Sequence, residues 1–311
     1  GMYCDEQGKL PELHSVRLAK QALQSADQTC AYLPMAGHAD YCAAAITLLF
    51  GKDSAVDRER IAMIQTLGGT GALRIGADVL KHLLPDSEVW ISDPGWDNHQ
   101  SIFAHAGFSV RRYPYLTAEA SSIDFSALLN CLERVSPHSI VVLHACCHNP
   151  TGLDLSEEQW KQLAEVIQAR ELIPFLDFAY QGFGSGIDED ALAVRLLAEK
   201  GIAFLVAQSF SKNFSLYGER CGTLAFYCQN ANQAQRAREQ MAYMVRGSYS
   251  NPPRYGARII AHILRDGELE AMWRLGVAAM RQRIQDMRQQ LVSNLTQSLG
   301  GDLFKGFLQR R

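Results

Sequence analysis

Runs of apolar residues alternate along this chain with segments in which apolar residues recur at helical spacing. Six runs predict β-strands: Ile61 to Thr66, Val89 to Ser92, Ser139 to Ala145, Pro174 to Phe178, Phe204 to Ala207 and Thr223 to Tyr227. Because most of these runs are nearly continuous in apolar residues rather than alternating, they are typical of strands buried on both faces. We therefore expect a mainly parallel sheet covered by helices.

Helical segments lie between several of these runs. The segment Ala72 to Leu84 follows a glycine-rich turn, and the segment Ala191 to Glu199 ends at Gly201. Ser156, with Gln159 three residues later, predicts a helix that opens with a capping box. The resulting βαβα order favours an α/β fold with a three-layer α/β/α arrangement.

The segment from Glu268 to about Leu299 has a different pattern. Apolar residues recur there every three to five positions among Arg and Gln, at Met272, Leu275, Met280, Ile284, Met287, Leu291 and Leu295. This spacing predicts one apolar stripe on a single long helix. A helix of this length often bridges two domains.

Composition narrows the functional classes. The 311 residues are 47% hydrophobic and 20% charged with a formal net charge of -3, and no Lys/Arg block indicates a nucleic-acid partner. No apolar run of about 18 residues predicts a membrane span, and the N-terminus lacks the pattern of a signal peptide. The eight cysteines are scattered singly except for Cys146 and Cys147, which favours reduced thiols in the cytoplasm.

Lys212 is the first candidate for chemistry. It follows the run Phe204 to Ala207, is flanked by Ser209 and Ser211, and has Arg220 eight residues further on. A lysine at the carboxyl end of a parallel strand faces the crevice where α/β sheets bind ligands. Hydroxyls and a guanidinium hold phosphates, and a lysine amine can form an imine with a carbonyl cofactor. An isolated lysine in a loop is most often simply solvated. The interpretation of Lys212 as a cofactor-binding residue therefore depends on the neighbouring Ser209, Ser211 and Arg220.

Asp177 interrupts the apolar run Pro174 to Phe178. A carboxylate there is costly to bury without a positive partner. It can cap a loop, or it can pair with a protonated pyridine nitrogen and keep that ring an electron sink. A right-handed crossover places the strand ends of Asp177 and Lys212 at the same edge of the sheet. Tyr180 offers a phenol that can hydrogen-bond the ring oxygen of the same cofactor.

A glycine-rich turn, Gly68-Gly69-Thr70-Gly71, follows the run Ile61 to Thr66. Glycines let the backbone approach a phosphate, and a helix N-terminus supplies N–H groups and a favourable dipole. Alone, such a turn is more often only a tight turn, and it matches neither the dinucleotide-binding pattern nor the P-loop. Trp96, just after the run Val89 to Ser92, can stack on a flat ring or close the edge of the core.

The cluster His144-Ala145-Cys146-Cys147-His148 invites a zinc interpretation. Neighbouring residues of a strand point to opposite faces, however, and do not easily converge on one metal. We favour a strand end that leads to Asn149, from which its amide can reach a ligand, and we assign no metal site. The Asn149–Pro150 bond is a candidate cis peptide.

Taken together, these residues resemble a known family. The chain is similar to the aspartate and aromatic-amino-acid aminotransferases, which are class I, fold-type I, pyridoxal-phosphate enzymes. The matching stretches follow one another in unbroken register: Tyr32 to Gly37, Gln65 to Arg74, Asp93 to His99, Cys146 to Gly152, Phe175 to Phe183, Ser209 to Arg220 and Ser248 to Pro253. Several blocks in the right order are more specific than any single motif.

The resemblance implies a division into two domains. A large cofactor-binding domain spans 1–267, and about ten residues at its start are a remnant of the small domain. The long interdomain helix and a truncated small domain span 268–311. By the family's standard the N-terminal arm is missing, as is the C-terminal portion with the arginine that grips the substrate α-carboxylate.

The resemblance also implies individual roles. Lys212 would carry pyridoxal 5'-phosphate as a Schiff base and shuttle protons, Asp177 would pair with the pyridinium nitrogen, and Tyr180 and Asn149 would contact the ring hydroxyl oxygen. The phosphate would be held by Gly69, Thr70, Ser209, Ser211 and Arg220, and by Tyr32 from the neighbouring subunit of a homodimer. Trp96 would pack on the ring. Substrate contacts would come from Gly1, Trp96, Asn149 and the neighbour's Arg246.

The implied activity is transfer of an amino group between an aromatic or dicarboxylic L-amino acid and a 2-oxo acid. The stretches Tyr32 to Met35, Ser209 to Lys212 and Phe214 to Gly218 look more like the aromatic branch than the aspartate branch. Three alternatives stay open. They are a cofactor binder with little turnover, a plain α/β domain without cofactor or with a metal at His144 and His148, and another pyridoxal-phosphate chemistry such as β-lyase or decarboxylase activity.

Overall fold

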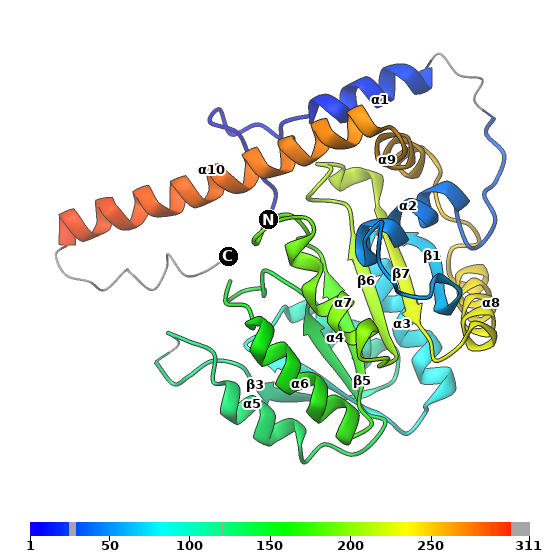
Figure 1. Ribbon diagram of the computed structural model, residues 1–311, viewed down its shortest axis with the longest axis vertical. Helices are drawn as coiled ribbons and strands as arrows, with labels where there is room; N and C mark the ends of the chain where they lie inside the picture. Colours follow the sequence, from blue (N-terminus) through cyan, green and yellow to red (C-terminus); the bar gives the residue numbers. More distant parts are fainter. Residues whose placement is uncertain (25–28, 120, 300–311) are drawn as a thin grey trace.

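The computed structural model describes residues 1–24, 29–119 and 121–299 (Figure 1). At its centre is a seven-stranded sheet with the order β1-β7-β6-β5-β4-β2-β3. The strands are β1 Ile61–Leu67, β2 Glu88–Asp93, β3 Ser109–Pro114, β4 Ile140–His144, β5 Ile173–Phe178, β6 Phe204–Ser209 and β7 Cys221–Tyr227. Strand β7 is antiparallel to β1 and β6, and the other neighbouring pairs are parallel. The predicted, mainly parallel sheet is therefore confirmed.

Helices cover both faces of this sheet, as the three-layer prediction requires. They are α1 His14–Gln24, α2 Ala39–Phe50, α3 Gly68–Leu83, α4 Asp97–His105, α5 Phe125–Leu132, α6 Glu157–Ala169, α7 Leu192–Glu199, α8 Ala231–Ser248, α9 Tyr255–Arg265 and α10 Gly267–Leu299. Helices α3, α4 and α8 pack in one core cluster, and the remaining helices contribute to the other. Along β1, Ile61 and Met63 belong to one cluster while Ala62 and Ile64 belong to the other, as successive strand residues must.

Strand β3 has no counterpart among the predicted runs. It lies at the edge of the sheet beside β2, and most of its side chains are exposed or half-buried. Arg111 and Arg112 pair there with the acidic side chains of Glu88 and Asp93. An edge strand buries little, so its sequence lacks the apolar run by which the inner strands were recognised.

Two predicted helix starts have different outcomes. Ser156 and Gln159 form the predicted capping box at the start of α6. Helix α3, in contrast, begins at Gly68 rather than at Ala72, so the glycine-rich turn is itself the first helical turn. The positive φ of Gly68, 69°, lets the chain leave β1 and enter this helix at once.

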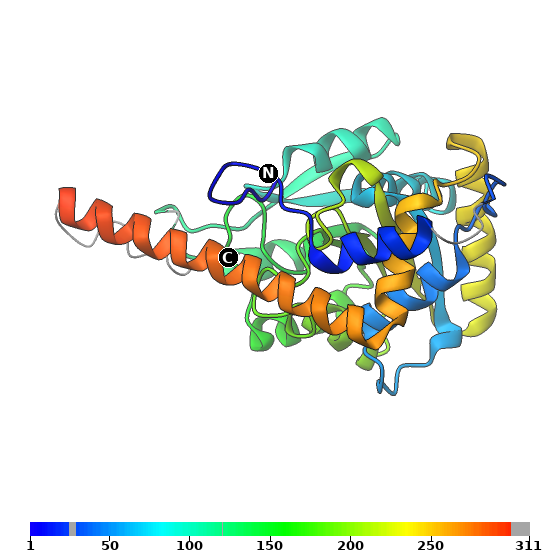
Figure 2. The ribbon, with the colours of Figure 1, turned by 90° about the horizontal axis from the view of Figure 1, so that it is seen from above.

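Helix α10 is the predicted long helix, but its packed face differs from the predicted stripe. Trp273, Val277 and Met280 are buried, whereas Leu275 is 73% exposed. Leu275 lies about 200° around the helix from Trp273. The helix packs against α1 and α9, and its second half projects beyond the sheet (Figures 1 and 2). None of the helices in the described ranges is long and apolar enough to cross a membrane.

Candidate functional site

The ends of β5 and β6 bring Asp177 and Lys212 to the same edge of the sheet. The two strands are parallel neighbours, and Asp177 pairs in register with Ala207 of β6. Lys212 follows β6 after the short link Phe210–Ser211. The crossover predicted from the sequence thus places the carboxylate and the amine on one side, as expected for a ligand crevice.

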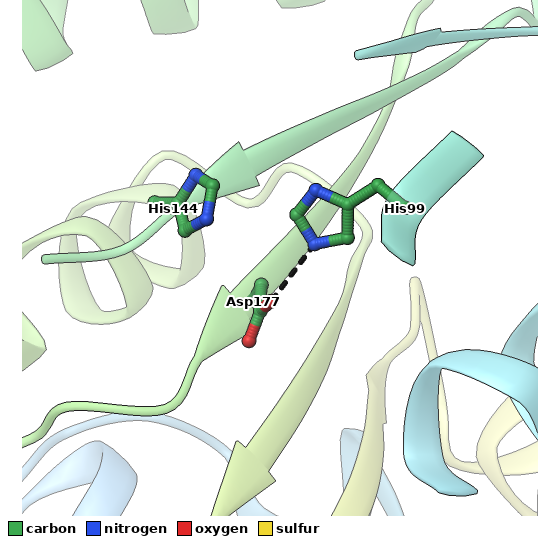
Figure 3. Close-up of side chains that lie close together, drawn as sticks. All are labelled: His99, His144 and Asp177. Atoms are coloured by element: carbon green, nitrogen blue, oxygen red, sulfur yellow. Dashed lines mark hydrogen bonds and ion pairs between the residues drawn. The ribbon is translucent and has the colours of Figure 1, made fainter. Parts of the chain in front are cut away.

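The carboxylate of Asp177 is buried and held by His99 of α4. Nε2 of His99 donates to Oδ2 of Asp177 at 2.8 Å, and the side chains are 1% and 5% exposed (Figure 3). Burial alone raises the pKa of the Asp177 carboxyl. The hydrogen bond from His99 and the interactions with His99, His144 and Lys212 outweigh burial and hold this pKa below its ordinary value. Asp177 is therefore an ionised acceptor at neutral pH.

Lys212 lies partly buried against Tyr180. Its Nζ is 4.8 Å from the centroid of the Tyr180 ring. Burial lowers the pKa of the Lys212 amine, Arg220 adds to this effect, and Asp177 opposes it. A lysine with a lowered pKa has a larger fraction of neutral, nucleophilic amine than an exposed one.

Beside Lys212, a cradle of hydrogen-bond donors forms where α3, β6 and β7 meet. Nη1 of Arg220 donates to Oγ of Ser211 at 3.5 Å, and Oγ of Ser209 donates to Oγ of Ser211 at 3.3 Å. A Cβ atom on Gly68 would lie 2.5 Å from Nη2 of Arg220, and one on Gly69 would lie 3.1 Å from Cβ of Ser209. The positive φ of Gly68 favours glycine there, and a side chain at Gly69 would require Ser209 to shift by a few tenths of an ångström.

This cradle has the properties of an anion site. Among the residues that the structure describes, no side chain caps the start of α3, so its first backbone N–H groups remain available to a ligand. Thr70, in the first turn, is exposed. A guanidinium, hydroxyls and a helix N-terminus together favour a bound phosphate.

A cavity of about 420 Å³ opens beside Lys212 and Tyr180. It is also lined by Asn149, which follows β4, and by Gly1 from the start of the chain. The Asn149–Pro150 bond is cis, as predicted, and so is Asp93–Pro94. The structure therefore brings together the predicted amine, phenol and amide, and it places Gly1 at the same cavity.

Trp96 and His99 come from one short stretch at the start of α4. The ring of Trp96 meets that of His99 edge-on, with centroids 5.2 Å apart. Sequence reasoning gave His99 no role, although it lies close enough to Trp96 on a helix to share its face. The spacing of three residues between Trp96 and His99 was the available signal.

Tyr32 and Arg246 lie away from the cavity. Tyr32 is 91% exposed, and Arg246 donates through Nη1 to Oγ of Ser250 at 2.9 Å. Nδ2 of Asn251 donates to the carbonyl oxygen of Leu33 at 2.7 Å. The segment with Tyr32 and the segment that follows Arg246 are therefore held together on the surface.

The two histidines proposed as an alternative metal site differ in their hydrogen bonding. The two ring nitrogens of His148 lie 2.9 Å from Oγ of Ser92 and 2.9 Å from Oγ1 of Thr151. One nitrogen of His144, Nδ1, has no hydrogen-bond partner. Ligand atoms of His99, His144 and Asp177 lie within 4.8 Å of one another, but Asp177 is already bonded to His99. Hydrogen bonding to Asp177 accounts for His99 without a metal.

Known proteins are similar to this chain in sequence and in fold. The family model for aminotransferase class I and II matches residues 1–305. The aromatic-amino-acid aminotransferase of Escherichia coli (strain K12) is 48% identical over 313 residues, covering 100% of this chain and 79% of that protein. The aspartate aminotransferase of Pseudomonas aeruginosa is 47% identical over 296 residues, covering 95% of this chain and 74% of that protein.

Solved structures give the same result. An aromatic amino acid aminotransferase from Burkholderia cenocepacia J2315 has a TM-score of 0.97 at 48% identity and covers 100% of this chain and 78% of its own. The aromatic-amino-acid aminotransferase from Burkholderia pseudomallei, covalently bound to pyridoxal phosphate, also has a TM-score of 0.97, at 46% identity, and covers 100% of this chain and 78% of its own.

Proposed function

Because the chain belongs to the class I and II aminotransferase family, whose cofactor is pyridoxal phosphate, we propose that Lys212 is the residue that binds this cofactor. The observation that carries the proposal is the convergence of three groups at one edge of the sheet. Lys212 supplies an amine, Asp177 a buried carboxylate, and Arg220 a guanidinium in a glycine-lined cradle.

The residues fit the cofactor in charge and in hydrogen-bonding groups. The cradle of Arg220, Ser209 and Ser211 suits a dianionic phosphate, and the ionised Asp177 suits a protonated ring nitrogen. The amine of Lys212 interacts electrostatically with both Asp177 and Arg220 and lies over the ring of Tyr180. When bound, the cofactor supplies an electron sink that no side chain offers.

The side chains then divide the work of amino transfer. Asp177, oriented by His99, would keep a proton on the ring nitrogen. The amine of Lys212 would accept the proton from the substrate Cα and return it to the C4′ carbon of the cofactor, a role that its lowered pKa favours. Tyr180 and Asn149 border the cavity at Lys212 and would hydrogen-bond the ring oxygen. Trp96 would pack on the ring face.

The remaining phosphate and substrate contacts follow the same arrangement. Gly69 and Thr70 lie in the first turn of α3 and would present backbone and hydroxyl donors to the phosphate. Gly1 lines the cavity and would contact the substrate.

The proposed substrates are an aromatic or dicarboxylic L-amino acid and a 2-oxo acid. Relatives named for aromatic amino acids and for aspartate are almost equally similar, at 48% and 47% identity, so we include both classes. A cavity lined by Tyr180 and Phe183 together with the cation of Arg283 can accommodate a ring or a second carboxylate.

A homodimer with shared sites completes the proposal. Tyr32 and Arg246 are exposed on one joined surface and do not line the cavity of their own chain. In a twofold dimer such a surface can reach the partner's site, where Tyr32 would contact the phosphate and Arg246 a second substrate carboxylate. All eight cysteines have free thiols, which supports a reducing compartment, the cytoplasm.

The visible absorbance spectrum tests this function. Pyridoxal phosphate is added to the wild type, to Lys212→Ala and to Lys200→Ala, which removes an exposed lysine. We expect a band that needs Lys212 but not Lys200 and that bleaches when tyrosine or aspartate is added. A band that does not change when amino acid is added would favour the cofactor binder with little turnover. A band that bleaches and then returns without added 2-oxo acid would favour another pyridoxal-phosphate chemistry, such as β-lyase or decarboxylase activity. Equal bands in all three proteins would refute the assignment of Lys212.

A further inference from the structure

We propose that Trp273 of α10 is a positioning residue for Lys212, acting through the backbone of Asn213. Nε1 of Trp273 donates to the carbonyl oxygen of Asn213 at 2.7 Å, and both residues are fully buried. Asn213 follows Lys212 directly in the chain. The long helix therefore holds the peptide next to the residue that we assign to the cofactor.

The contact between α10 and the Lys212 turn extends beyond this hydrogen bond. The indole ring of Trp273 stacks on Phe214, with centroids 4.5 Å apart and planes 12° from parallel. The carbonyl oxygen of Lys212 accepts the N–H of Ser215 at 3.1 Å, which closes the turn. The backbone on the C-terminal side of Lys212 is thus fixed by a hydrogen bond and by a ring stack, both from one tryptophan.

The side chain of Asn213 connects the Lys212 turn to the segment that contains Tyr180. Its Nδ2 donates to the carbonyl oxygen of Gln181 at 3.2 Å, and Gln181 follows Tyr180 directly. Gln181 is itself fixed, because its Nε2 donates to the carbonyl oxygens of Leu48 and Ile187 at 3.2 and 2.9 Å. One buried network therefore joins α10 to the two residues, Lys212 and Tyr180, that lie against each other at the cavity.

Asn213 is a costly choice for a residue with a packing role alone. Its Oδ1 is buried and has no hydrogen-bond partner within residues 1–24, 29–119 and 121–299. An unsatisfied buried acceptor lowers stability, and an apolar side chain of similar size would avoid this loss. The amide is explained if its Nδ2, together with the backbone carbonyl held by Trp273, is needed to fix Lys212 relative to Tyr180.

The pKa of the Lys212 amine is the quantity that should report this positioning. Burial lowers the pKa of this amine, Arg220 lowers it further, and Asp177 raises it. If the turn loosens, water reaches the amine and this pKa returns toward its ordinary value. Trp273→Phe keeps a ring to stack on Phe214 but removes the N–H donor, so it isolates the hydrogen bond.

The test is the pH dependence of Lys212 acetylation by acetic anhydride in the full chain, read by mass spectrometry. Trp160→Phe is the matched control, because Trp160 of α6 is also buried and belongs to another helix than Trp273. The exposed Lys161 serves as an internal reference. We expect Trp273→Phe to raise the midpoint of the pH dependence of Lys212 acetylation by about half a pH unit. This shift corresponds to a roughly threefold change in the ratio of charged to neutral amine, and we expect no shift in Trp160→Phe.

An unchanged Lys212 midpoint in a folded Trp273→Phe variant would reduce Trp273 to a packing residue and overturn the proposal. If that variant does not fold, Asn213→Ala decides in its place, since it cuts the link to Gln181. A raised midpoint there supports the network, and an unchanged one refutes it. The inference rests on the proposed function only in taking Lys212 as the reactive amine. Acetylation of Lys212 needs no cofactor. If no absorbance band formed with pyridoxal phosphate, the proposed function would be refuted, but the acetylation experiment would still decide the role of Trp273.

Discussion

Nε2 of His99 lies 2.8 Å from Oδ2 of Asp177, and both side chains are almost completely shielded from solvent. The two residues are 78 positions apart, one on α4 and the other on β5. The pair keeps a buried carboxylate ionised without an exposed salt bridge. A negative charge is thus fixed at the edge of the sheet where a cationic ring nitrogen can meet it.

Removing that charge is expected to affect turnover more than cofactor binding. Asp177→Asn keeps the shape of the side chain but leaves nothing to hold a proton on the ring nitrogen. We expect the reaction with tyrosine or aspartate to slow by at least about 100-fold in single-turnover absorbance measurements. Asp97→Asn, at an exposed carboxylate of α4, is the control and should react at the wild-type rate. Equal rates in the two variants would contradict the role given to Asp177.

His144 is expected to make the fold sensitive to mild acid. Burial and then the neighbouring His99 lower the pKa of His144 from 6.5 to about 4, against the attraction of Asp177. Between these values the unfolded chain binds more protons than the folded protein, so stability is lost as the pH falls from 6.5 to 4. The contribution is at most roughly 3 kcal/mol.

Replacing this histidine should remove that sensitivity. We expect the stability of His144→Gln to fall less between neutral pH and pH 4 than that of the wild type, measured by urea denaturation at a series of pH values. His105→Gln changes an exposed histidine of α4 and should follow the wild-type curve. A His144→Gln curve parallel to that of the wild type would show that His144 is not held neutral by burial.

The cofactor cradle is expected to depend on Arg220. Loss of a charged hydrogen-bond donor to a phosphate is worth about 1.5–3 kcal/mol, so Arg220→Ala should weaken binding of pyridoxal phosphate roughly 10- to 100-fold. The affinity of Arg220→Lys for pyridoxal phosphate should lie between those of the wild type and Arg220→Ala, because an ammonium keeps the charge without the paired donors of the guanidinium. Absorbance titration measures the affinity, and Arg236→Ala at an exposed arginine of α8 is the control. An Arg220→Ala affinity equal to that of the control would place the phosphate elsewhere.

Shared sites predict complementation between two inactive variants. Lys212→Ala lacks the amine, and a double variant, Tyr32→Ala with Arg246→Ala, lacks the residues expected to reach the partner. In random mixed dimers one site regains all three residues, so activity should recover to about one quarter of the wild-type value. The assay compares each variant alone with the mixture after exchange of subunits. No recovery, with dimers present by light scattering, would remove Tyr32 and Arg246 from the partner's site.

The sequence determined the local chemistry and the class of fold. Continuous apolar runs such as Phe204 to Ala207 are possible only where both faces of a strand are buried, so the parallel sheet followed from them. Lys212, Asp177 and Arg220 were recognisable because each places charge next to a buried strand, and the crossover rule brought the first two to one edge. The edge strand β3 escaped detection because it buries little.

Tertiary structure alone decided which side chains complete the site. His99 meets Asp177 and Trp273 meets Asn213, and neither contact leaves a periodic pattern in the chain. The packed face of α10 was likewise set by α1 and α9, which bury Trp273 and leave Leu275 in solvent. Periodicity fixes how an element presents its residues, whereas contacts between distant elements depend on how those elements pack in three dimensions.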